Sequence, residues 1–125
     1  MISPEEQASE SCVFFKVVRS CNDIAIGYKV KPIRCNLIWN SRLTTTIGRA
    51  IVDFKSTRSG TVELSSKLWT RADHQTTLHI MYHELAHIFA ELEQEKANHG
   101  PVWKKWMDRF AQPSDVTIMI EAIND

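Results

Sequence analysis

A continuous apolar stripe over residues 78–92 constrains the fold of this chain more than any other feature. Large apolar side chains recur there at steps of three and four residues, which is the spacing of one face of an α-helix. The stripe comprises Leu78, Met81, Tyr82, Leu85, Ile88, Phe89 and Leu92. We therefore predict a helix that begins near Asp73, buries this stripe and ends in the polar stretch 91–96.

The same helix carries two histidines four residues apart, in the sequence His83-Glu84-Leu85-Ala86-His87. Residues at this spacing project from one side of a helix, so both imidazoles can reach a single metal ion, and zinc accepts nitrogen ligands. Glu84 lies about 100° around the helix from His83, where it can take a proton from a zinc-activated water without being a ligand. The pattern predicts a catalytic zinc site with Glu84 as general base, and the alternative is a solvated helix face.

A hydrolytic zinc ion needs a third protein ligand and an open fourth position. Glu91 lies one turn beyond His87, but a third ligand from the same helix would place all three in a line. His99 follows the helix end, in the sequence NHGP, where Gly favours termination and Pro favours the start of another helix. The chain can turn back there, so we prefer His99 as the third ligand. His79, one turn before His83, is predicted to be a partly buried neighbour.

The N-terminal part of the chain predicts a helix that begins after Ser3. Ser3 suits the N-cap, Pro the first helical position and Glu the third. We expect this helix to run to about Arg19 and residues 20–32 to be irregular. Its inner side is predicted to hold Ala8, Cys12, Phe15 and Val18.

Three short strands are predicted over residues 33–39, 44–54 and 61–64, from period-two alternation and β-branched residues. Gly48 interrupts the second strand, which indicates a bulge or a close backbone approach. Short strands joined by short turns favour an antiparallel sheet. A last helix begins at Pro101 and ends at Pro113, and residues 114–125 are ambiguous between strand and helix.

Length and composition indicate one domain over residues 1–125. No apolar run approaches the roughly 20 residues of a membrane span, and the acidic N-terminus is not a secretory signal. An intracellular location, cytoplasmic or nuclear, is therefore expected. The three cysteines include no C-x-x-C pair, which argues against a disulfide framework and a cysteine-based zinc ribbon. Reduced, mostly buried thiols are expected.

The net charge is zero but unevenly distributed. Residues 29–71 hold nine Lys/Arg against two Asp/Glu, a net of +7. Residues 1–28 hold two against four, and residues 72–125 hold four against nine, giving −2 and −5. A basic segment of this kind suits a polyanion, although a solvated sheet surface has the same pattern.

Four segments, in this order, resemble the SprT-like zinc metalloprotease family, which includes the Spartan proteases. WNSRLTTTIGR, from Trp39, resembles the family's tryptophan-to-glycine strand pair, and VELS, from Val62, resembles its short strand. HELAH matches the active helix, and HGPVW, from His99, resembles the segment that supplies the third ligand. The resemblance covers roughly residues 37–112.

This resemblance implies a small α+β, zincin-like metalloprotease domain. Its parts are an N-terminal helix, a three-stranded antiparallel sheet, the HExxH helix and a following C-terminal helix. It implies one Zn²⁺ held by His83, His87 and His99, with Glu84 as general base, and a protein substrate. In Spartan-type members the substrates are proteins crosslinked to DNA, and single-stranded DNA is the activator.

The basic segment suits a DNA-facing surface in this family. The expected nucleic-acid contacts are Arg42, Arg49, Lys55, Arg58, Lys67 and Arg71. Trp39 and Trp69 are candidates for stacking on unpaired bases, with core packing as the alternative. Two other functions remain open: a zinc protease of cytosolic proteins or peptides that needs no nucleic acid, and a non-catalytic, zinc-stabilised binding module. The intact Glu84 argues against the module, because a structural zinc site does not need a general base.

Overall fold

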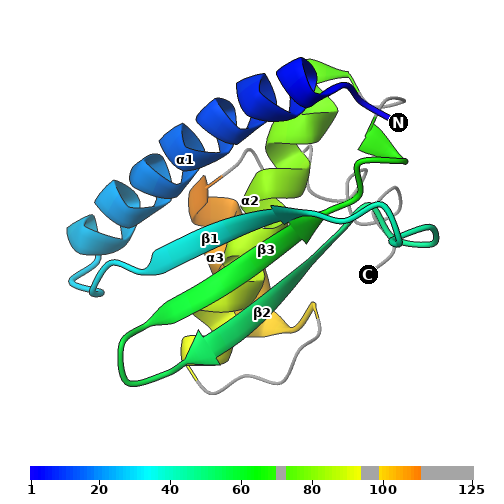
Figure 1. The fold of residues 1–125 in the computed structure, drawn as a ribbon. Coiled ribbons are helices and arrows are strands. Elements are labelled where there is room, and N and C mark those ends of the chain that lie inside the picture. The colour runs from blue at the N-terminus through cyan, green and yellow to red at the C-terminus, as the bar shows by residue number, and fades with distance from the viewer. Residues whose placement is uncertain (70–72, 94–98, 111–125) are drawn as a thin grey trace.

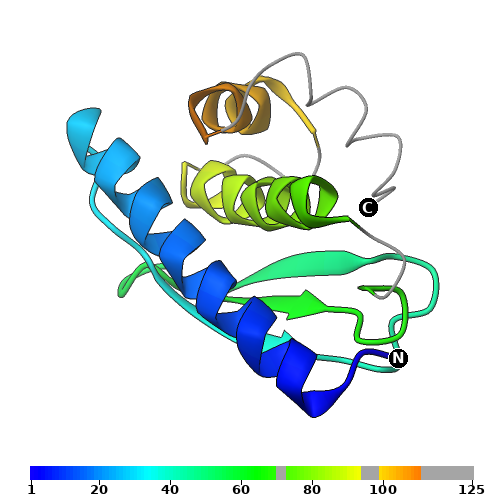
Figure 2. The same cartoon turned by 90° about the horizontal axis from the view of Figure 1, so that it is seen from above.

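The structure is a computed structural model that describes residues 1–69, 73–93 and 99–110 of the chain. Within these ranges a small sheet is packed against helices, so the α+β class is confirmed (Figure 1). The elements are α1 (Pro4–Gly27), β1 (Arg34–Trp39), β2 (Gly48–Phe54), β3 (Ser59–Leu64), α2 (His74–Leu92) and α3 (Pro101–Phe110). Figure 2 shows α2 lying between the sheet and α3. The predicted helix end at Pro113 and segment 114–125 lie outside the described residues.

α1 begins as predicted but is longer than expected. Ser3 Oγ accepts from the backbone N–H of Glu6, and the Glu6 carboxylate accepts from the backbone N–H of Ser3, which completes a capping box. The helix then continues to Gly27 rather than ending near Arg19. Its buried side is Phe14, Val17, Val18, Cys21 and Ala25, so the inner side was predicted correctly only for Val18.

Tertiary contacts explain the extra turns of α1. Cys21 and Ala25 are completely buried, so the second half of the helix is held by packing although its β-branched residues favour helix only weakly. Asn22 adds a specific link to the sheet. Its side-chain amide donates to the Ile33 carbonyl at 3.0 Å and accepts from the Ile33 N–H at 2.9 Å. Residues 20–27, expected to be irregular, are therefore helical.

The C-terminal end of α1 is a Schellman motif. After the C-cap Tyr28, the N–H of Lys29 donates to the Ile26 carbonyl and the N–H of Val30 donates to the Ala25 carbonyl, both at 2.9 Å. Lys29 has φ 62°, the left-handed conformation that glycine usually occupies at this position. The motif turns the chain from α1 towards β1.

The sheet is mixed, with the strand order β1-β3-β2. β2 and β3 form an antiparallel hairpin, as predicted, but β1 lies parallel to β3 with Asn36 opposite Thr61. The purely antiparallel prediction is therefore wrong. The loop after β1 passes the end of β3 and enters β2 on its far side, so consecutive strands are not neighbours. Period-two alternation predicts a strand but does not identify its neighbour.

β2 begins at Gly48 rather than at Thr44, and β3 begins at Ser59 rather than at Thr61. The close backbone approach predicted at Gly48 is present. A Cβ placed there would lie 3.1 Å from Leu64 Cδ2 and 3.2 Å from Glu84 Oε2. The register irregularity of β2 lies elsewhere, between Val52 and Phe54.

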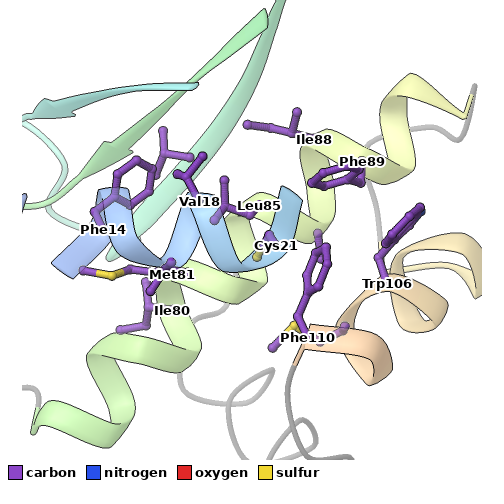
Figure 3. Packing of buried hydrophobic residues seen from close by; sticks show 14 of the residues in the cluster. Phe14, Val18, Cys21, Ile80, Met81, Leu85, Ile88, Phe89, Trp106 and Phe110 are labelled. Atoms are coloured by element: carbon purple, nitrogen blue, oxygen red, sulfur yellow. The ribbon is translucent and has the colours of Figure 1, made fainter. Parts of the chain in front are cut away.

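The core lies between the sheet and the three helices of the described ranges. The predicted stripe of α2 supplies its centre: Met81, Leu85, Ile88 and Phe89 are almost completely buried. Figure 3 shows these side chains meeting Phe14 and Cys21 of α1 and Trp106 and Phe110 of α3. No helix in the described ranges is both long enough and apolar enough to span a membrane.

The three cysteines are free thiols, in agreement with the expectation. Cys21 is buried and Cys35 partly buried, whereas Cys12 is exposed on α1. Burial raises the pKa of Cys35 to about 12 and that of Cys21 well above its usual value. Both thiols therefore stay protonated at neutral pH and behave as small apolar core residues.

Candidate metal centre

Three imidazoles converge at one point. His83 and His87 come from successive turns of α2, and His99 immediately precedes α3. Nε2 of His83 lies 3.2 Å from Nε2 of His87 and 3.0 Å from Nε2 of His99. Among the described residues these three form the group that could hold a metal ion, with ligand atoms all within 4.8 Å of one another.

The spacing of the nitrogens fits a tetrahedral zinc site. Zinc–nitrogen bonds of about 2.0–2.1 Å place two ligand nitrogens of a regular tetrahedron roughly 3.3–3.4 Å apart. The two Nε2 separations from His83 are slightly below that value. His83 is fully buried, whereas His87 and His99 are only partly buried, so one side of the cluster reaches solvent. The donor set fits three protein ligands with a fourth position accessible from outside.

Trp103 of α3 forms a wall behind the three histidines. Its ring centroid lies 4.9 Å from that of His83, 5.7 Å from that of His87 and 4.5 Å from that of His99. Its indole Nε1–H donates to the His83 backbone carbonyl at 3.2 Å. The sequence reasoning placed Trp103 on a helix face but did not recognise this role, although its position four residues after His99 was an available signal.

Glu84 is completely buried between α2 and the sheet. Its carboxylate faces the start of β2, where the missing side chain of Gly48 leaves it space. Because Glu84 directly follows His83 on the helix, a carboxylate is held beside the imidazole cluster without joining it. This is the placement expected of a proton acceptor next to a metal rather than of a ligand.

The other predicted candidates near the site occupy different positions. His79 is buried, with 8% of its surface exposed, as expected of a buried neighbour. Glu91 is partly buried and does not belong to the converging group. Glu93 caps α2 and accepts from Lys105 Nζ and Trp106 Nε1, both at 2.7 Å, so it joins α2 to α3.

The structure separates the six expected nucleic-acid contacts. Arg42 and Lys67 are exposed near the end of the sheet where β1 and β3 finish. Lys55 and Arg58 lie in the β2–β3 hairpin, at the opposite end. Arg49, in β2, forms an ion pair with Glu63 of β3. Arg71 lies outside the described residues.

The two tryptophans proposed for base stacking pack against each other instead. The rings of Trp39 and Trp69 meet edge to face with centroids 5.4 Å apart. Trp69 is 3% exposed, and Trp39 Nε1 donates to Ser11 Oγ at 3.0 Å. Core packing, the alternative reading of these residues, is therefore their role.

Comparison with known proteins agrees with this geometry. The sequence profile of the SprT-like family matches residues 16–121. The chain belongs to the SprT-like family. A search of curated proteins finds no match to this SprT-like chain.

Among solved structures, the fold of this SprT-like chain is similar to that of the metallopeptidase zymogen of Pyrococcus abyssi abylysin. The TM-score is 0.55 at 21% sequence identity, over 88% of this chain and 90% of that one. The likeness supports a metallopeptidase fold, which extends over nearly the whole chain.

Proposed function

We propose that this SprT-like chain is a zinc-dependent metalloprotease and that residues 1–125 form a single catalytic domain. The observation that carries the proposal is the convergence of three histidine Nε2 atoms beside the buried Glu84. His83, His87 and His99 would hold one Zn²⁺, and Glu84 would be the general base. The family membership and the metallopeptidase-like fold support this reading.

The residues divide the chemistry of peptide hydrolysis between them. Zinc, when bound, supplies a Lewis acid that polarises the scissile carbonyl and lowers the pKa of a water. Glu84 accepts the proton of the attacking water and delivers it to the leaving amine. Leu64 and the space at Gly48 confine its carboxylate. Trp103 restrains the imidazoles, which keeps their nitrogens directed at one point.

The proposed substrates are DNA-bound or DNA-crosslinked proteins, which places the activity in DNA–protein crosslink repair. The +7 charge of residues 29–71 and the likeness to Spartan-type proteases support a polyanion near the substrate. Single-stranded or damaged DNA is then a partner of the enzyme, and a cytoplasmic or nuclear location follows from this proposal.

A crosslink-cleavage assay tests the proposal. The purified chain is analysed for bound metal and then incubated with a protein crosslinked to a single-stranded oligonucleotide. We expect about one zinc per chain and cleavage that a chelator abolishes. Glu84→Gln should retain zinc but lose cleavage, because it removes the proton acceptor and keeps the three imidazoles. Equal cleavage by the wild type and Glu84→Gln would exclude the enzyme hypothesis.

A second candidate is a zinc protease that acts without nucleic acid. Two observations favour it: Arg49 is neutralised by Glu63, and Trp69 is buried, so part of the expected DNA surface does not exist. Cleavage of an unstructured protein such as casein, with and without single-stranded DNA, separates the two candidates. Equal rates in both arms favour this second function.

A further inference from the structure

Five cationic residues gather at the end of the sheet where α1 finishes and the β2–β3 hairpin turns. Figure 1 shows the C-terminal end of α1, the start of β1 and this hairpin at the same side of the molecule. We call this region the hairpin-end surface. Its members are the cations Lys29, Lys31, Arg34, Lys55 and Arg58 and the aromatic residues Tyr28 and Phe54.

Backbone contacts tie these segments together, although they are separated by more than twenty residues in the sequence. Arg58 Nε donates to the Lys31 carbonyl at 3.2 Å, and the Arg34 N–H donates to the Arg58 carbonyl at 2.9 Å. The Arg58 N–H donates to the Lys55 carbonyl at 3.1 Å. The cations therefore share one surface because of the parallel pairing of β1 with β3, which the sequence did not predict.

The charge of this surface is largely uncompensated. Segments 28–34 and 53–59 contain five Lys/Arg and one acidic residue, Asp53, which leaves a net charge of +4. Asp53 Oδ2 accepts from Thr61 Oγ1 at 2.7 Å, so its carboxylate is engaged within the sheet. A cluster of this sign and density attracts a polyanion.

Two of these cations occupy backbone positions that favour glycine. Lys29 has φ 62° and Arg58 has φ 51°, both in the left-handed region. A side chain with a Cβ costs folding free energy in this conformation, and glycine would avoid the cost. Backbone strain of this kind is concentrated at functional sites. Two cations kept at strained positions of one surface point to a use for their charge.

Exposed aromatic rings border the cations. Phe54, the last residue of β2, is 67% exposed, and Tyr28 is 54% exposed. The guanidinium of Arg109 lies over one face of the Tyr28 ring, 3.6 Å from its centroid, and adds a further cation. Cations that follow a phosphate backbone, together with aromatic rings that stack on bases, are the elements of single-strand recognition.

From these features we propose that the hairpin-end surface binds single-stranded nucleic acid, with the cations on phosphates and Phe54 and Tyr28 on unpaired bases. The inference deepens the proposed function and rests on its nucleic-acid part. It reassigns the contacts: Lys55 and Arg58 of the expected set remain, Lys29, Lys31 and Arg34 join them, and Arg42 and Lys67 lie at the opposite end.

A pair of charge-matched double variants tests the location. Lys31→Gln with Lys55→Gln neutralises two exposed side chains of the surface, and Arg42→Gln with Lys67→Gln removes the same charge at the opposite end. Binding of a labelled oligothymidylate is followed by fluorescence anisotropy over a range of salt concentrations. We expect weaker binding for the first pair, with a salt slope reduced by roughly 1.4, or 0.7 per phosphate contact, and little change for the second. Melting curves verify that each variant is folded.

Two single variants separate binding from folding. Lys29→Gly should leave the melting temperature unchanged or raise it, because glycine suits the left-handed position, yet it should weaken binding. Phe54→Ala should weaken single-strand binding by about tenfold, as expected for the loss of one stacked base, and should leave duplex binding nearly unchanged.

Other results would overturn the inference. If the Arg42/Lys67 pair weakens binding as much as the Lys31/Lys55 pair, the surface is wrong. If the wild type binds polyglutamate or phosphatidylserine vesicles as tightly as single-stranded DNA through Lys31 and Lys55, the ligand is wrong. Casein cleavage measured on the same samples tests the protease independently, so failure of this surface is distinguishable from failure of the proposed enzyme.

Discussion

Gly48 and Glu84 approach each other so closely that a side chain at position 48 would press on the carboxylate. A Cβ built on Gly48 would lie 3.2 Å from Glu84 Oε2, and Leu64 Cδ2, at 3.1 Å, prevents it from moving aside. The start of β2 thus fixes the position of the proposed general base. This relationship joins the sheet to the chemistry and leads to the first prediction.

Gly48→Ala should lower kcat by roughly 10- to 100-fold, because small displacements of a catalytic group have effects of this size. Zinc content should not change, since the three histidines do not contact position 48. Gly27→Ala is the matched control, because a Cβ there meets nothing within 4 Å. Steady-state kinetics and metal analysis of both variants check the prediction. Normal kcat in Gly48→Ala would show that Glu84 tolerates displacement.

Trp103→Ala should weaken zinc binding by about 10- to 100-fold, as expected when the support of metal ligands is removed. It should also destabilise the fold by roughly 3–5 kcal/mol, because Trp103 is completely buried. Trp103→Phe keeps an aromatic wall but loses the hydrogen bond to the His83 carbonyl. Competition with a zinc indicator should therefore rank the affinities as wild type, then Phe, then Ala. An unchanged affinity in Trp103→Ala would limit this residue to packing.

Asn22→Ala should reduce the free energy of unfolding by about 2 kcal/mol, because it removes both hydrogen bonds to the backbone of Ile33. Ile33 is buried, so water does not readily replace these bonds. Asn36→Ala, at an exposed position of β1, should change stability by no more than about 0.5 kcal/mol. Urea denaturation of both variants provides the measurement. Equal stabilities would mean that the link between α1 and β1 is unimportant.

Asp73 should make part of the stability depend on acidic pH. The Thr76 N–H donates to its carboxylate, which lowers the pKa of Asp73 below its ordinary value of 3.8. A carboxylate with a depressed folded-state pKa stabilises the fold above the unfolded-state pKa, and this contribution is lost as the pH falls through the folded-state value.

Asp73→Asn should retain the helix cap and lose this component of the acid dependence, because asparagine caps helices without titrating. Melting temperatures measured from neutral pH down to pH 2 should therefore decline less steeply for Asp73→Asn than for the wild type. Parallel curves for the two proteins would contradict the assignment.

The sequence by itself determined the elements whose signals are local. Spacings of three and four residues fixed α2 and its buried stripe, and the pairing of Ser3 with Glu6 fixed the start of α1. The four-residue step from His83 to His87 needed nothing beyond helix geometry. His99 could be chosen because a turn after the helix returns the chain towards these two side chains.

Only the tertiary structure decided the features that depend on contacts between distant segments. Alternating residues did not show that β1 lies parallel to β3, because strand pairing is set by the path of the chain. The extension of α1 to Gly27 depends on the burial of Cys21 and on the link from Asn22 to Ile33.

The same limit applied to function. Trp103 as the wall behind the histidines and the division of the basic residues between two ends of the sheet are long-range contacts. A local pattern specifies which residues a helix or strand presents, whereas the free energy of packing the whole chain decides what they meet.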